Sequence, residues 1–226
     1  MDEQIASQHA LLEQVLCEAG GQPIAPLVDA GYTGKIADVL FAEDDVIVEV
    51  KSLTTDRAAD PAVGEAVGEM FARSTHLGAP VIFGTVTIGL HDLPPKIAAN
   101  TLRIVGSRVQ AEAKAANKQL KASKTALGRP NALGVVALIT PPFKLDRDSI
   151  AWTMGDAMRE GRCSSIDVFL LVETPLAEPL DPAAVGNSFL SLHSRGDRLL
   201  PMHLVEAIYQ AWGRVTGQLG HRVNDD

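Results

Sequence analysis

Three charged residues interrupt two short apolar runs between Lys35 and Leu53. They are Asp38, Glu49 and Lys51, in the sequence KIADVLFAEDDVIVEVKSL. Charged side chains inside an apolar segment are costly unless they are paired or bind a metal ion. Two carboxylates and an ammonium group can hold a divalent cation and activate a water molecule, so this stretch is the first candidate for chemistry.

The same stretch predicts a β-hairpin with a turn centred on Glu43 and Asp44. The register pairs Phe41 with Val46, Leu40 with Ile47, Val39 with Val48, and Asp38 with Glu49. Because strand side chains alternate between faces, the charged residues share one face. The opposite face is apolar and is expected to pack against helices; it comprises Ala37, Val39, Phe41, Val46, Val48 and Val50.

The pattern of Asp38 followed by Glu49-Val50-Lys51 resembles the PD-(D/E)XK nuclease superfamily. The signature of that superfamily is an Asp near the end of one strand and a Glu-x-Lys on the next strand of a hairpin. Here Ala37, and not proline, precedes Asp38. The resemblance implies an α/β protein with a restriction-endonuclease-like core, in which a mixed β-sheet is flanked by helices.

The resemblance also implies roles for individual residues. Asp38, Glu49 and the backbone carbonyl of Val50 would hold one or two Mg²⁺ ions, with Mn²⁺ as a substitute, and Lys51 would position or activate the water. The opening helix of such nucleases often adds an acidic ligand. Glu13 is the main candidate here, Glu3 and Glu18 are less well placed, and Gln8 and His9 lie nearer the expected position; a solvated role for Glu13 is the alternative.

A basic segment follows the hairpin. Between Lys96 and Arg129 there are eight basic residues and one acidic residue, Glu112. Since the chain as a whole has a net charge of −8 and this segment +7, the remainder has −15. Such asymmetry indicates a local surface for polyanions on an acidic protein.

Within this segment a long helix is expected from Lys96 to Leu127, with Gly106 as its weak point. Lysines at helical spacing form a predicted nucleic-acid-binding stripe: Lys114, Lys118, Lys121 and Lys124. An ordinary solvated face is the alternative interpretation of the stripe. Gln119 resembles the glutamine that nucleases of this superfamily direct at the active site, and is therefore a candidate catalytic residue.

Composition limits the remaining classes. Hydrophobic residues make up 46% and charged residues 21% of the 226 residues, as in a folded domain. There is no apolar run of about 18 residues and no signal-peptide pattern, so we expect a cytoplasmic protein without a membrane partner. Walker, dinucleotide-binding and Gly-x-Ser-x-Gly motifs are absent, and the histidines lack zinc-type spacing.

Further elements are expected along the chain. Helices are predicted over residues 2–19, 63–76, 149–161 (capped by Asp148 or Ser149) and 201–217, and strands over 22–32 (irregular), 79–90, 133–140 and 166–173. We expect one nuclease-like domain over residues 1–226, with an insertion at 54–95 that shapes substrate access or dimerisation and a C-terminal extension at 175–226. A homodimer is a possible assembly.

The resulting expectation is a Mg²⁺-dependent phosphodiesterase, most specifically a DNA endonuclease in restriction, defence or repair. The alternative is an inactive protein of the same fold that binds nucleic acid or a partner protein. The two differ in whether Asp38, Glu49 and Lys51 support turnover.

Overall fold

The computed structural model describes residues 2–53, 57–82, 84, 88–141, 145–174 and 188–217. Within them six strands form one open mixed sheet in the order β1-β2-β3-β4-β5-β6. The strands are β1 (Gln22–Pro23), β2 (Val39–Phe41), β3 (Val46–Ser52), β4 (Leu133–Thr140), β5 (Val168–Glu173) and β6 (Phe189–Ser194). The α/β class and the mixed sheet flanked by helices are therefore confirmed.

The predicted hairpin register is confirmed for three of its four pairs, but the expected Asp38–Glu49 pair does not form, because strand pairing stops at Val39. Val39 pairs with Val48, Leu40 with Ile47 and Phe41 with Val46. Strand β2 runs antiparallel to both of its neighbours, β1 and β3, whereas β3, β4 and β5 are parallel. The fully buried run of β4 lies at the centre of the sheet, as its continuous apolar sequence predicts.

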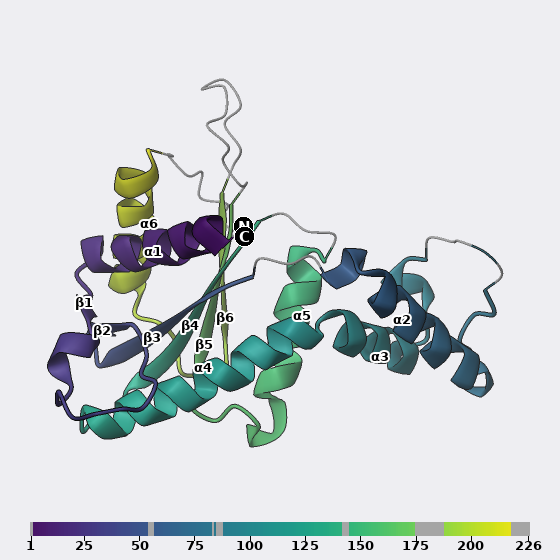
Figure 1. The fold of residues 1–226 in the computed structure, drawn as a ribbon, viewed down its shortest axis with the longest axis horizontal. Helices are drawn as coiled ribbons and strands as arrows, with labels where there is room; N and C mark the ends of the chain where they lie inside the picture. The colour runs from purple at the N-terminus through teal and green to yellow at the C-terminus, as the bar shows by residue number, and fades with distance from the viewer. Residues whose placement is uncertain are drawn as a thin grey trace.

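Helices cover both faces of the sheet (Figure 1). Helices α1 (Asp2–Glu18) and α6 (Met202–Thr216) pack on one face, with Leu12, Leu16, Leu204 and Trp212 in a core that includes Val48 and Val50. Helices α4 (Ser107–Ala126) and α5 (Arg147–Met158) pack on the other face. The apolar hairpin face thus contacts α1 and α6, while the face with Glu49 looks towards α4.

The expected alternation of faces is wrong at Ala37. This residue belongs to the core on the α4 side, because strand pairing stops at Val39 and the Ala37 N–H donates to Ser123 Oγ of α4 at 2.7 Å. Alternation holds only within a paired strand. Ala37 therefore links the start of β2 to α4.

The predicted long helix is two helices. Helix α3 (Pro95–Val105) ends at Gly106, and α4 begins at Ser107. A Cβ at Gly106 would lie 2.5 Å from Thr153 Oγ1 of α5, so glycine is needed for this close approach. Arg103 also contacts α5, where its guanidinium pairs with Asp156 at 3.0 Å.

Helices α2 (Pro61–Arg73) and α3 extend away from the sheet on one side of the molecule (Figure 1). Between them lies a small separate core of Phe71, Ala79, Leu93 and Ile97. The strand predicted over 79–90 is wrong for its described residues, 79–82, 84 and 88–90, none of which is in a strand. Their apolar side chains have helices, and no neighbouring strand, to pack against, so tertiary context overrides β propensity.

The chain also contains short 3₁₀ helices and a strand that the sequence did not predict. The 3₁₀ helices are Ala25–Leu27, Arg57–Ala59, Thr75–Leu77, Leu90–Asp92 and Arg159–Gly161. Strand β6 pairs antiparallel with β5 inside the region expected to be a C-terminal extension.

The predicted cap of α5 is wrong. The cap is Asp146, whose side chain accepts from Ser149 N–H at 2.8 Å, and not Asp148 or Ser149.

Asp167, at the start of β5, joins several elements through its buried carboxylate. Oδ2 accepts from Gly134 N–H at 2.8 Å, and Oδ1 lies 3.0 Å from Arg198 Nη1. Lys124 Nζ of α4 lies 3.5 Å from the same carboxylate. These contacts give Asp167 a structural role, because its carboxylate joins the start of β5 to β4, α4 and Arg198.

Gly134 on β4 is expected to tolerate no side chain. A Cβ there would lie 1.9 Å from the Ser165 carbonyl oxygen, which is backbone and cannot move aside as a side chain can. Gly134→Ala should therefore lower the free energy of unfolding by about 1–3 kcal/mol or more in urea denaturation. Gly64→Ala in α2 is the matched control; with no atom within 4 Å of its Cβ, it should stabilise by about 0.5–1 kcal/mol.

Candidate functional site

Asp38 immediately precedes β2, at the end of the paired part of the β2–β3 hairpin. Beyond the Val39–Val48 pair, β3 continues to Ser52 without a partner residue from β2. Asp38 Oδ2 accepts from Val50 N–H at 2.7 Å, so the carboxylate replaces the missing strand acceptor. Because the N–H and carbonyl of one strand residue point to the same edge, the Val50 carbonyl also lies on the Asp38 side.

Glu49 is the most deeply buried charged residue of the site, with 1% exposure. Its Oε1 lies 2.5 Å from Lys51 Nζ, whereas its Oε2 has no hydrogen-bond partner among the described residues. Burial, followed by the nearby negative charge of Asp38, raises the pKa of Glu49 to about 8. The carboxylate is therefore costly to ionise without a further cation.

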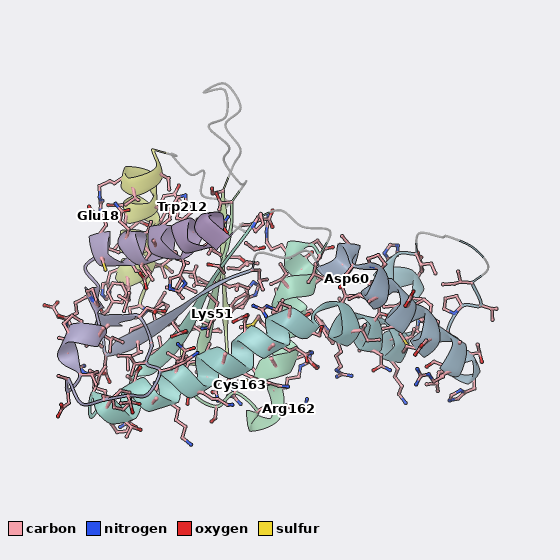
Figure 2. All side chains as sticks on the ribbon, in the orientation of Figure 1. Glu18, Lys51, Asp60, Arg162, Cys163 and Trp212 are labelled. Atoms are coloured by element: carbon pink, nitrogen blue, oxygen red, sulfur yellow. The ribbon has the colours of Figure 1, made fainter. Side chains whose placement is uncertain are left out.

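Lys51 and Gln119 meet as predicted. Lys51 extends from the end of β3 between α1 and α4 (Figure 2). Its Nζ donates to Gln119 Oε1 at 2.8 Å, and Gln119 Nε2 donates to the Ile36 carbonyl at 3.2 Å. Gln119 thus links α4 to the chain entering β2 and holds the ammonium beside Glu49.

Helix α1 brings two side chains to Asp38. His9 Nε2 lies 3.2 Å from Glu13 Oε1 and 3.8 Å from Asp38 Oδ1. One ligand atom from each residue lies within 4.8 Å of the other two. The structure therefore places the predicted Glu13 beside Asp38 and adds His9. The neighbouring Asp38 carboxylate is the main cause that raises the pKa of His9, and burial opposes this rise only in part.

The sequence pointed to His9 without assigning it as a ligand. The available signal was its spacing of four from Glu13, which puts the two side chains on one helix face. The direction of that face relative to Asp38 could not be predicted, because it depends on how α1 packs across the sheet.

The predicted lysine stripe is not uniform. Lys124 is 8% exposed and paired with Asp167, so its assignment as a nucleic-acid-binding residue is wrong. Its ammonium also donates to the Ser165 carbonyl at 3.3 Å. Lys114, Lys118 and Lys121 are exposed, and none has an ion pair in the part of the chain that the structure describes.

The stripe and Gln119 lie on different sides of α4. Gln119 faces the Ile36 carbonyl, whereas Asn117 accepts from Ser165 N–H near β5. Helical spacing places Lys114 and Lys121 with Asn117, across the helix from Gln119, and Lys118 on the outer surface. Lys114 and Lys121 are therefore separated from Lys51 by the width of α4, whereas Lys118 lies about 100° around the helix from Gln119.

Searches of protein-family models, curated proteins and solved structures find no match to this chain. The site must be interpreted from its own geometry.

None of the helices within the described residues is both long enough and apolar enough to cross a bilayer.

Proposed function

We propose that this protein is a metal-dependent nuclease of the PD-(D/E)XK superfamily that hydrolyses phosphodiester bonds, most specifically a DNA endonuclease in restriction, defence or repair. The observation that carries the proposal is the buried Glu49 Oε2. It has no hydrogen-bond partner within the described part of the chain, and the carboxylate of Glu49 interacts with the charges of Asp38 and Lys51. A restriction-endonuclease-like core is the fold that this proposal assigns to the mixed sheet.

The oxygen atoms at the sheet edge fit a hard divalent cation. Asp38, Glu49 and the Val50 carbonyl would supply oxygen ligands, the chemistry that Mg²⁺ prefers and that Mn²⁺ accepts. A cation there would also offset the burial and the repulsion from Asp38 that together raise the pKa of Glu49. When bound, the ion lowers the pKa of a water ligand and neutralises charge developing on the scissile phosphate.

The remaining residues position the reaction. Lys51 is 15% exposed and is held by Gln119, so its ammonium is oriented at little entropic cost when a phosphate approaches. Its charge would orient the attacking water and stabilise the developing negative charge. By resemblance to the superfamily, the products would be a 5′-phosphate and a 3′-hydroxyl.

A specific observation favours the alternative, a binding protein without turnover. Lys51 already pairs with Glu49 at 2.5 Å and bonds to Gln119. This network compensates the negative charge of Glu49 with the ammonium of Lys51 without any metal ion. In that case the exposed lysines of α4 would hold nucleic acid or a partner protein, and the site would be structural.

Residues 54–95, whose described part includes α2, have a proposed role as an insertion in the nuclease core, and α2 packs against α3, which follows the insertion. Their own small core around Phe71 and Ile97 supports this assignment. An element that extends from the sheet can contact substrate beyond the cleaved bond or a second copy of the chain.

The deciding experiment is a cleavage assay on supercoiled, linear and single-stranded DNA and on RNA. We expect the full chain to cut at least one DNA form with Mg²⁺ or Mn²⁺ and to stop when a chelator is added. Absence of cleavage of every form, together with binding that weakens steeply with salt, would establish the binding protein instead.

Reversing two exposed charges of α4 should weaken nucleic-acid binding. Lys118→Glu combined with Lys121→Glu should lower affinity for all sequences alike and reduce the slope of log K against log[salt] by about 1 for each phosphate that is no longer neutralised. Arg214→Glu reverses one exposed charge on α6, on the opposite face of the sheet from α4, and is the control for net charge. Fluorescence anisotropy across a salt series measures both; equal slopes for wild type and the Lys118/Lys121 variant would make the stripe an ordinary solvated surface.

A further inference from the structure

Two arginines from different elements meet at one partly buried tryptophan, Trp152 of α5. The guanidinium carbon of Arg103 in α3 lies 5.9 Å from the centre of the Trp152 ring, and that of Arg159, directly after α5, lies 5.6 Å from it. At such distances the negative face of an indole ring attracts a guanidinium cation. Trp152 therefore holds two cations close together.

Asp156, one helical turn after Trp152, contacts the same two arginines. Arg103 donates to both carboxylate oxygens, from Nη2 to Oδ1 at 3.0 Å and from Nε to Oδ2 at 3.1 Å. Arg159 Nη1 lies 4.0 Å from Oδ1. The side chain of Asp156 is 7% exposed, whereas those of Arg103 and Arg159 are 46% and 60% exposed. One buried carboxylate thus orients two cations that solvent can reach.

A structural link between α3 and α5 explains only part of this arrangement. The two-point contact of Arg103 with Asp156 is enough to join the helices. Arg159 adds nothing to that link, because it follows Asp156 by three residues in the same stretch of chain. Its guanidinium is nevertheless held beside Trp152 while its side chain stays exposed. A long cation that is already held loses little further entropy when it binds an anion.

Further basic side chains surround this site. They are Arg162, Lys114 and Arg195, of which the first two are exposed. The charge of Arg162 helps to lower the pKa of Asp156, although the hydrogen bond from Arg103 is the largest cause. Burial raises the pKa of Cys163, the residue after Arg162, and the charges of Lys114 and Arg195 oppose this rise. Basic groups from α3, α4, the end of α5 and the end of β6 therefore share one surface.

We propose that Arg103 and Arg159, held by Trp152 and Asp156, bind backbone phosphate of nucleic acid at a contact point outside the Asp38 site. The planar fork of a guanidinium matches two phosphate oxygens, and an aromatic ring keeps the fork in place. Several cations along one surface fit a ligand with phosphates in a row better than a single anion. The inference rests on the proposed function only in taking nucleic acid as the ligand, and it requires no cleavage.

Tryptophan fluorescence of the full chain tests the site. The titrants are a short single-stranded oligodeoxynucleotide and the duplex of the same sequence, in the presence of a chelator. The chain has two tryptophans, and the second, Trp212, is 3% exposed in the core on the opposite face of the sheet. We expect DNA to change the emission of wild type, and we expect this change to be absent in Trp152→Phe.

Variants of Arg159 give the second readout, by fluorescence anisotropy across a salt series. Arg159→Gln should lower affinity for DNA by about tenfold and reduce the slope of log K against log[salt] by about 1, because one charge-assisted phosphate contact is lost. Arg159→Lys should restore the slope but only part of the affinity, since an ammonium cannot make the two-point contact. Arg214→Gln is the matched control. Its side chain is 52% exposed and ion-paired on the opposite face of the sheet, so affinity and slope should stay unchanged.

The outcomes separate this inference from the proposed function. DNA binding that depends on Arg159, without cleavage of any nucleic acid, would uphold the phosphate contact and remove the nuclease. Cleavage by wild type together with unchanged DNA affinity and salt slope in Arg159→Gln would overturn the inference and leave the nuclease standing. An equal change in Trp152 emission on titration with polyglutamate would also overturn it, because the surface would then not select phosphate.

Discussion

Replacing Asp38 with asparagine should reduce metal-dependent phosphodiester cleavage by at least about 100-fold, while the metal-free protein stays as stable as wild type. Mutation of residues that only orient metal ligands typically lowers metal affinity or activity by about 10–100-fold. Removal of the charge of a ligand itself should lower the activity further. The fold should persist because the asparagine carbonyl can still accept from Val50 N–H, as Asp38 Oδ2 does at 2.7 Å. The substitution also removes the negative charge that opposes ionisation of Glu49.

The measurements are kcat/KM with Mg²⁺ and Tm in the presence of a chelator. Asp44→Asn neutralises a carboxylate in the turn of the same hairpin, where its partner is His203, and should change cleavage little. Wild-type rates in Asp38→Asn would remove Asp38 from the site. A large loss of Tm would instead make it a structural residue of the β2 and β3 junction.

Replacing Glu49 with glutamine should stabilise the metal-free protein at neutral pH and abolish its stabilisation by divalent ions. The ordinary pKa of 4.5 is raised to about 8 in the folded chain. Between these values the folded state binds more protons than the unfolded state, so the free energy of unfolding falls as pH rises, by up to about 1.4 kcal/mol per pH unit. Because glutamine does not titrate, the free energy of unfolding of the variant should not show this fall with rising pH.

Thermal unfolding with a chelator at pH 5 to 8 measures the first effect, and added Mg²⁺ or Mn²⁺ measures the second. An ion present at a hundred times its Kd stabilises by about 2.7 kcal/mol, which corresponds to several degrees in Tm at about 2–4 °C per kcal/mol for a chain of this size. Glu13→Gln is a useful comparison because it neutralises a carboxylate of α1 whose side chain is 39% exposed. Identical pH profiles for wild type and Glu49→Gln would show that the ion pair with Lys51 is enough to stabilise the ionised carboxylate of Glu49, without a metal ion.

The hairpin could be predicted because its information is local. Two apolar runs, an acidic turn and alternation with period two determine which residue faces which, and the pairs from Val39–Val48 to Phe41–Val46 follow. Gln119 was placed near Lys51 by a resemblance, and the structure joins them at 2.8 Å. Its role in catalysis stays a prediction.

The errors come from non-local packing. Lys124 resembles its neighbours in sequence, but it turns towards Asp167, which is distant along the chain and adjacent in the fold. The apolar residues around Ala79 have strand-like composition, yet they fill the space between α2 and α3. His9 was left unassigned for the same reason, since only the packing of α1 on the sheet brings it to Asp38.

The hydrogen bond from Gln119 to the Ile36 carbonyl has a consequence for folding kinetics. The two residues are 83 positions apart, and the parallel pairing of β3 with β4 spans a similar length of chain. Contacts of such separation form slowly because a long loop must close before they contribute. The β2–β3 hairpin and α4 can form early from local contacts, so a refolding chain should acquire helix and hairpin signals before Lys51 reaches Gln119.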